Sequence, residues 1–153
     1  METHLHKVEV EPLSDSSLDW FVNIAAVQML THEVKRTELI HMGQLHRLAV
    51  MGKESGTAFI SKIGNKYTGA IGGLLLPNVF NPDIKTLTEI FWYVLPEYRN
   101  TRSGLMLLNT FNKCGMECAD EINMCLLMDS PVSTKSLEKR GFEMKEVSFR
   151  KGT

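Results

Sequence analysis

The residues best suited to chemistry lie in a turn at positions 96–104, whose sequence is PEYRNTRSG. The turn stands between a run rich in β-branched and aromatic residues and a segment with helical apolar spacing. A strand that runs directly into a helix leaves backbone amides without acceptors at the helix N-terminus. The helix dipole, together with Arg99 and Arg102, adds positive charge at the same point. The pattern therefore predicts a phosphate or diphosphate site, with a solvated basic turn as the alternative.

Regular elements must hold this turn in place, and apolar periodicity predicts where they lie. Alternation and short apolar runs predict strands, whereas three- and four-residue spacing predicts helices. The expected strands cover residues 5–10, 57–63, 67–76, 87–95, 122–128 and 142–150. The expected helices cover residues 16–30, 31–49, 102–119 and 134–140. The resulting order is β-α-α-β-β-β-α-β-α-β, without an internal repeat or linker.

Capping and turn residues mark some of the element ends. Asp15 or Ser16 is expected to cap the first helix, because either side chain can accept from the free amides of a first turn. Thr31 is expected to cap the second helix in the same way. Gly64 and Asn65 predict the turn of an antiparallel hairpin between the strands at 57–63 and 67–76.

Composition and charge limit the class of protein. At 153 residues the chain has the length of one domain, which we expect to cover residues 1–153. Its net charge of −1 provides no long-range field for nucleic acid or an acidic membrane, and no apolar window is long enough to span a bilayer. Three cysteines, an odd number, and a first segment without an apolar leader predict a cytoplasmic location. Cys114 and Cys118 have no second close pair of Cys or His, so no metal site is expected.

Two stretches of the sequence resemble the GNAT family of acetyl-CoA-dependent N-acetyltransferases. Residues 89–108 look like the signature strand, loop and helix, whose family pattern is R/Q-x-x-G-x-G/A. Arg99 falls on the first position and Gly104 on the last, whereas Arg102 replaces the middle glycine. Residues 133–142 are similar to the C-terminal helix and its closing Gly-Phe. The resemblance implies one α+β domain of the broad α/β class, with a mixed central sheet whose fourth and fifth strands run parallel and splay apart.

The resemblance also implies acetyl-CoA as a co-substrate. In the family, the loop amides hold the diphosphate, and the fourth strand pairs with the pantetheine arm as if with an added strand. The residues that this assigns to the coenzyme are Tyr93, Val94, Leu95, Arg99, Asn100, Thr101, Arg102, Ser103, Gly104 and Leu105. An arginine at position 102 either hinders the close approach that glycine permits or supplies a guanidinium to the phosphates.

Glu89 is the candidate general base. A free lysine amine titrates near pH ~10.4, so acetyl transfer to an amine needs a group that takes up its proton. Glu89 lies ten residues before Arg99, at a position that resembles the base of several family members. Its alternative role is a carboxylate at the start of a strand that faces solvent or pairs with a lysine.

The general acid of the family has no counterpart in this sequence. Leu137 stands where many members have a tyrosine that protonates the departing thiolate, and Ser130 replaces the corresponding asparagine. Ser133, Thr134, Ser136 or solvent remain as proton donors.

The expected function is transfer of an acetyl group from acetyl-CoA to a primary amine of a small molecule or protein, by direct attack. One alternative is a catalytically weak protein of the same fold that binds coenzyme A or acts as an interaction or assembly module. Another is a transferase acting on charged tRNA, which would need a broad basic surface that a net charge of −1 does not promise. Exposed sheet edges would allow a homodimer. The acceptor is not specified by the sequence.

Overall fold

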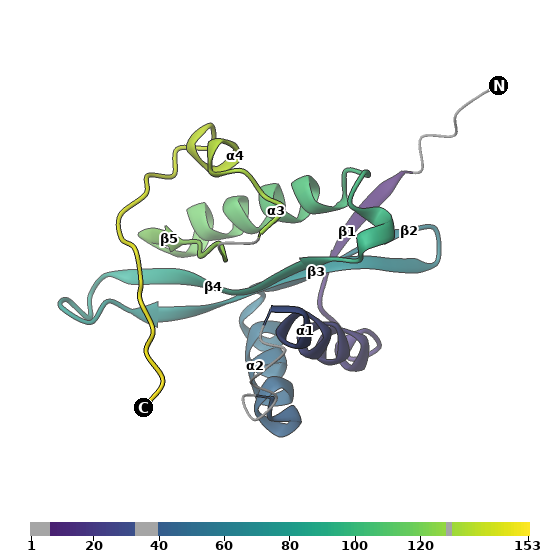
Figure 1. Cartoon of the computed structure of the whole chain (residues 1–153), viewed down its shortest axis with the longest axis horizontal. Coiled ribbons are helices and arrows are strands. Elements are labelled where there is room, and N and C mark those ends of the chain that lie inside the picture. Colours follow the sequence, from purple (N-terminus) through teal and green to yellow (C-terminus); the bar gives the residue numbers. More distant parts are fainter. Residues whose placement is uncertain (1–6, 33–39, 128–129) are drawn as a thin grey trace.

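The computed structural model describes residues 7–32, 40–127 and 130–153 (Figure 1). Its elements along the chain are β1 (Val8–Pro12), α1 (Leu18–His32), α2 (Met42–Ser55), β2 (Ala58–Ile63), β3 (Lys66–Pro77), β4 (Lys85–Val94), the short 3-10 helix η2 (Pro96–Tyr98), α3 (Ser103–Cys118), β5 (Glu121–Asn123) and α4 (Thr134–Glu138). No helix in these described ranges is long and apolar enough to cross a membrane.

The strands form one mixed sheet in the order β1-β2-β3-β4-β5. Neighbours from β1 to β4 are antiparallel, and β5 runs parallel to β4. Helices α1 and α2 cover one face of the sheet, and α3 covers the other (Figure 1). Phe21 and Phe91 belong to the core under α1 and α2, whereas Ile71, Leu107 and Phe111 belong to the core under α3. The expected mixed central sheet is confirmed.

An irregularity in β4 changes the direction of its side chains. Gly72 is paired with Phe91 and Gly73 with Glu89, so Ile90 has no partner on β3. Such an extra residue moves the following side chains to the opposite face. Accordingly Leu87 packs under α3 and Phe91 under α1, although residues four apart share a face in a regular strand. Glu89 lies exactly at this change of direction.

The parallel strands β4 and β5 separate soon after they begin. Their pairing runs from Thr86 opposite Glu121 to Thr88 opposite Asn123. Strand β4 continues to Val94, and within the described residues no further strand accompanies it on this side. The splay expected between the fourth and fifth strands is therefore present.

The last expected strand does not form. Residues 142–150 have no regular structure, and Met144, Val147 and Phe149 expose 69%, 68% and 93% of their surface. Positions 144, 147 and 149 do not alternate, so a strand could not bury all three side chains on one face. Strand β5 also ends at Asn123 rather than at residue 128, which shortens the edge available for pairing.

The helix starts differ from the capping predictions. Thr31 lies inside α1, where its hydroxyl donates to the Val27 carbonyl at 2.8 Å. His41 caps α2 instead, because its Nδ1 accepts from the Gln44 amide at 3.0 Å. Residues 33–39 of the helix predicted over 31–49 lie outside the described residues.

At the start of α1, the carboxylate of Asp15 pairs with Lys53 of α2 rather than with the helix amides. The first main-chain bond of α1 runs from the Phe21 amide to the Ser17 carbonyl, which makes Ser17 the residue at the cap. The hairpin turn is as expected, with Gly64 at a φ of 60°.

Candidate functional site

A cavity of about 320 Å³ lies where β4 and β5 separate. Its walls come from β4, the turn after β4, the start of α3, the segment after β5 and one side chain of α1. The sequence-predicted residues in its lining are Glu89, Tyr93, Val94, Arg99, Thr101, Gly104 and Leu105. The lining residues that were not assigned to a site are Gln28, Trp92, Cys125, Leu126, Leu127, Ser130, Pro131 and Val132. One cavity thus joins the candidate base to the candidate phosphate turn.

Four other predicted residues do not line this cavity. Leu95 donates its amide to the Thr68 carbonyl at 2.9 Å, and Ser103 is fully buried. Asn100 and Arg102 are exposed on the turn. These residues therefore lie beside the cavity rather than in its wall.

The backbone of β4 faces the cavity at Trp92 and Val94. The Leu95 amide donates to the Thr68 carbonyl of β3, so the backbone N–H and C=O groups of odd-numbered residues at this end of β4 point to β3. Because these groups alternate in direction along a strand, those of the even-numbered residues point to the open side. Side chains indeed reach two carbonyls on this side. Gln28 Nε2 donates to the Trp92 oxygen at 2.9 Å, and Arg99 Nε donates to the Val94 oxygen at 3.0 Å.

The turn between β4 and α3 carries amides without acceptors. Those of Asn100, Arg102, Gly104 and Leu105 donate to no atom of the described residues, and the N-cap residue Arg102 makes no side-chain bond to the helix amides. Unpaired amides at the start of a helix form a favourable place for an anion. The geometry thus provides the donors that the sequence pattern predicted.

Arginine at position 102 does not obstruct this turn. Its φ of −83° and ψ of 4° are accessible to any residue, so a glycine is not required by the backbone. Its side chain is exposed and lies outside the cavity lining. Gly104 does line the cavity, and a Cβ added there would meet only Val94 Cγ2, at 3.6 Å.

Arg99 fastens the turn to the end of β4. Besides its bond to the Val94 carbonyl, its guanidinium carbon lies 5.2 Å from the centroid of the Tyr93 ring, a cation–π distance. The guanidinium is thereby held at the cavity with donors left over for an anion.

Glu89 combines burial with access to the cavity. Only 8% of the residue is exposed, and its Oε2 accepts from the Cys125 amide at 3.4 Å. Burial raises the pKa of Glu89 from 4.5 to about 7, against the smaller opposing effect of the Cys125 amide. A carboxyl with this pKa can accept a proton near neutral pH, as a general base must.

The hydroxyls named from the sequence as possible proton donors, those of Ser133, Thr134 and Ser136, do not line the cavity. Leu137 is buried in α4 and offers no proton, and the Ser133 hydroxyl accepts from the Lys135 amide as the cap of that helix. Ser130 lines the cavity, and its oxygen accepts from the Val132 amide at 3.2 Å, which leaves its proton available.

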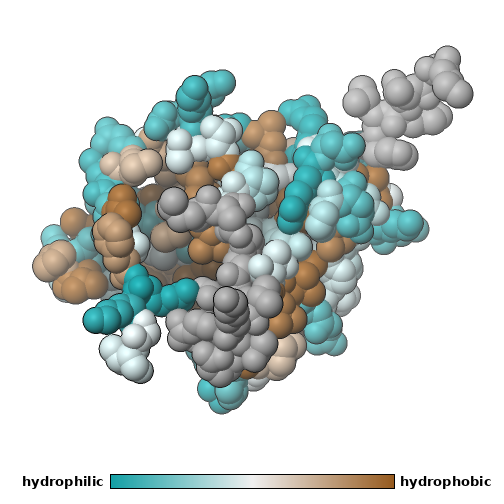
Figure 2. Space-filling view, in the orientation of Figure 1, coloured by the Kyte–Doolittle hydropathy of each residue, from teal (hydrophilic) through white to brown (hydrophobic). Residues whose placement is uncertain are grey.

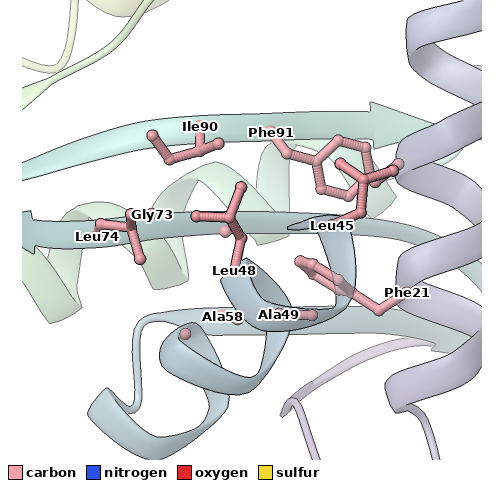
Figure 3. Close-up of a pocket in the computed structure, with 12 residues that line it drawn as sticks. Phe21, Leu45, Leu48, Ala49, Ala58, Gly73, Leu74, Ile90 and Phe91 are labelled. Carbon is pink, nitrogen blue, oxygen red and sulfur yellow. The ribbon is translucent and has the colours of Figure 1, made fainter. Parts of the chain in front are cut away.

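A second, smaller hollow lies between the sheet and helices α1 and α2. It measures about 40 Å³, and Leu45 and Leu48 of α2 lie opposite Ile90 and Phe91 of β4 there (Figure 3). All of its lining residues are apolar or glycine. It therefore supplies no acid or base.

The surface over β4 and β5 is hollowed, and hydrophobic residues are visible within the hollow (Figure 2).

Among the described residues, no three His, Cys, Asp or Glu side chains are close enough to hold a metal ion. The Cys114 and Cys118 sulfurs lie 4.0 Å apart on α3.

Solved structures with the same fold were found across almost the whole chain. A transcriptional regulator from Bacillus halodurans C-125 matches with a TM-score of 0.73 and 13% identity, over 96% of this chain and 100% of the other. An aminoglycoside acetyltransferase from an uncultured soil metagenomic sample, in complex with sisomicin, matches with a TM-score of 0.69 and 14% identity, over 95% and 96%.

A predicted acetyltransferase from Clostridium acetobutylicum, solved with acetyl-CoA, matches with a TM-score of 0.68 and 13% identity, over 95% of this chain and 96% of the other. No protein-family model and no curated protein sequence matches the chain. At such low identity the matches establish the architecture, which is the fold of the GNAT acetyltransferases.

Proposed function

We propose that the protein is an acetyl-CoA-dependent N-acetyltransferase acting on a primary amine of a small molecule or protein. The observation that carries the proposal is the cavity that connects the unpaired amides of the β4–α3 turn to the buried carboxyl of Glu89. The two solved acetyltransferases of this fold support it, one in complex with an aminoglycoside and the other with acetyl-CoA.

The chain offers donors for each part of the coenzyme. The free amides at 100, 102, 104 and 105, with the Arg99 guanidinium, suit a diphosphate. The Trp92 and Val94 amides, on the open edge of β4, suit the amide groups of pantetheine, which would lie as an added strand. The resemblance assigned these contacts to Tyr93, Val94 and Leu95. This proposal uses Trp92 and Val94, because Tyr93 and Leu95 turn their polar groups to β3.

Glu89 would act at the end of the cavity where pairing between β4 and β5 stops. Acetyl-CoA supplies an acetyl group activated as a thioester. The Glu89 carboxylate would take the proton that the amine loses as its nitrogen bonds to the acetyl carbon and the carbon–sulfur bond breaks. The departing thiolate would receive a proton from Ser130 or from solvent.

The test of the activity is release of free thiol from acetyl-CoA in the presence of a panel of amines. We expect release with at least one amine and a large loss, on the order of a hundredfold, in Glu89→Gln. Glu97→Gln is the matched control, because it removes a carboxylate of the same length from the exposed turn. Equal turnover of the two variants would contradict the role of Glu89.

A catalytically weak coenzyme-binding module is the second candidate. The observation in its favour is Leu137, which is buried at the place where the family has its tyrosine acid. It predicts binding of acetyl-CoA without thiol release for any amine of the panel.

A cytoplasmic location and a homodimer are proposals that the sequence alone supports, and sedimentation analysis would test the dimer.

A further inference from the structure

A chain of buried hydroxyl groups runs from the sheet to the β4–α3 turn. Ser61 Oγ on β2 lies 2.8 Å from Thr68 Oγ1 on β3, and Thr68 Oγ1 lies 2.9 Å from Ser103 Oγ at the start of α3. Ser103 Oγ is in turn 3.0 Å from Thr101 Oγ1 in the turn itself. Ser61, Thr68 and Ser103 have no exposed surface. We call this set the hydroxyl chain.

The position of the hydroxyl chain is unusual for polar groups. It lies where β2, β3 and α3 pack together, a place that apolar side chains fill in most cores. A buried hydroxyl contributes little net stability even when it is hydrogen-bonded, because folding only exchanges its bonds to water. Stability alone therefore gives little reason for successive hydroxyls here, whereas directed bonds fix a geometry.

Thr68 holds both ends of the turn. Its carbonyl accepts from the Leu95 amide at 2.9 Å, where β4 ends, and its hydroxyl bonds to Ser103, where α3 begins. The residues between these two attachments carry two of the four free amides, those of Asn100 and Arg102. A change at the Thr68 hydroxyl would therefore release one end of the turn and leave the other attached.

The hydroxyl chain also includes the start of α3. Ser103 is the first residue of this helix, and its hydroxyl is directed to Thr68 and Thr101 rather than to a helix amide. Thr101 Oγ1 meanwhile bonds to the Tyr98 carbonyl at 2.5 Å and accepts from the Ser103 amide at 3.2 Å. The amide of Gly104 is thus left for an external acceptor.

We infer that the hydroxyl chain is a positioning device for diphosphate binding, with Thr68 as its central positioning residue. The inference rests on the proposed function. The hydroxyl chain holds the turn in the conformation that leaves these amides free for an anion, so the cost of ordering the turn is met before the ligand arrives. Thr68 acts through the turn and lies outside the cavity lining.

The experiment compares two ligands, only one of which carries the diphosphate. Dephospho-coenzyme A contains the diphosphate and the adenosine attached to it, and pantetheine contains the same arm without either. Their dissociation constants are measured by calorimetric and NMR titration for wild type, Thr68→Val, Thr68→Ser and Thr57→Val. Thr57→Val is the matched control, because Thr57 is 1% exposed and its hydroxyl bonds to the Gly73 carbonyl at 2.6 Å, outside the hydroxyl chain.

We expect Thr68→Val to weaken dephospho-coenzyme A by about tenfold, which corresponds to about 1.4 kcal/mol. Pantetheine binding should change by less than about twofold, because ordering of the turn does not enter its affinity. Thr68→Ser, which keeps the hydroxyl, should restore the wild-type value, and Thr57→Val should bind both ligands as wild type does. A purely structural role would weaken both ligands together.

Three results would overturn the inference. If Thr68→Val binds dephospho-coenzyme A as tightly as wild type does, the inference is refuted and the proposed function is not. The same holds if Thr68→Val loses as much affinity for pantetheine as for dephospho-coenzyme A. If the wild-type protein binds neither ligand, the proposed function and the inference are both refuted. If Thr68→Val does not fold in a thermal melt, Ser103→Ala interrupts the hydroxyl chain at the next link and is held to the same criteria.

Discussion

Glu89→Gln should stabilise the protein at alkaline pH and much less at acidic pH. Burial raises the pKa of Glu89 in the folded protein from 4.5 to about 7, whereas the unfolded chain retains the ordinary value. Between these values the folded state binds more protons than the unfolded state. The free energy of unfolding of wild type must therefore fall as pH rises through this window. Glutamine does not titrate, so the variant lacks this fall.

The size of the effect follows from the window. The pKa difference is about 2.5 units, and each unit corresponds to about 1.4 kcal/mol, which gives about 3 kcal/mol once pH is well above 7. Because the residue is 8% exposed, solvent screening reduces this value little. For a chain of 153 residues the difference corresponds to a rise of roughly 6 to 12 °C in melting temperature.

The assay is urea unfolding of wild type and Glu89→Gln at a series of pH values from about 4.5 to about 8.5, followed by circular dichroism. The difference between the two proteins isolates this carboxyl, because all other groups titrate in both. Glu97→Gln, which removes an exposed carboxylate from the β4–α3 turn, is the matched control variant. Parallel curves for wild type and Glu89→Gln would show that Glu89 ionises normally and would refute its description as a buried base.

Three further outcomes follow from the same structure. The kcat/KM for acetyl transfer should rise with pH to a plateau above about 7, as Glu89 ionises, and a pH–rate profile of Glu89→Gln should lack this rise. Gly104→Ala should bind acetyl-CoA as wild type does, since its Cβ meets only Val94 Cγ2 at 3.6 Å, whereas Gly104→Leu should fill the cavity and weaken binding more than about tenfold in calorimetry. Gly73→Ala should lower the free energy of unfolding in urea by about 2 kcal/mol, because its Cβ would lie 2.7 Å from Phe111 Cζ.

Elements whose conformation depends on residues close together in the sequence were predicted from the sequence. The hairpin at Gly64 and the long amphipathic helix α3 were predicted within a few residues, because turn residues and apolar spacing act over short distances. The same holds for the phosphate turn, whose free amides follow from a strand that runs directly into a helix.

Features that depend on distant parts of the chain were not predictable. Trp92 enters the site because its pairing with β3 directs its polar groups to the open edge, and Gln28 enters because α1 packs over β4, 64 residues away along the chain. The bulge at Ile90 arises from the register of β3 with β4. Alternation within one strand reveals neither the register nor the partner.

From the sequence, Arg102 in place of the family's glycine had two possible effects. It could hinder the close approach of the phosphates, or its guanidinium could bind them. The backbone settles part of this, because a φ of −83° needs no glycine and the side chain stays outside the cavity. The final segment was predicted wrongly as a strand, because a run of apolar residues was read without strict alternation at 144, 147 and 149.

The most direct test of diphosphate recognition is an amide NMR titration of the wild-type protein with coenzyme A. We expect the amide signals of Asn100, Arg102, Gly104 and Leu105 to shift most, because they are the donors without acceptors in the turn. Amides already bonded within the sheet should move little. Saturating coenzyme A that leaves these signals unchanged, or that shifts only signals remote from the turn, would contradict the site described for this protein.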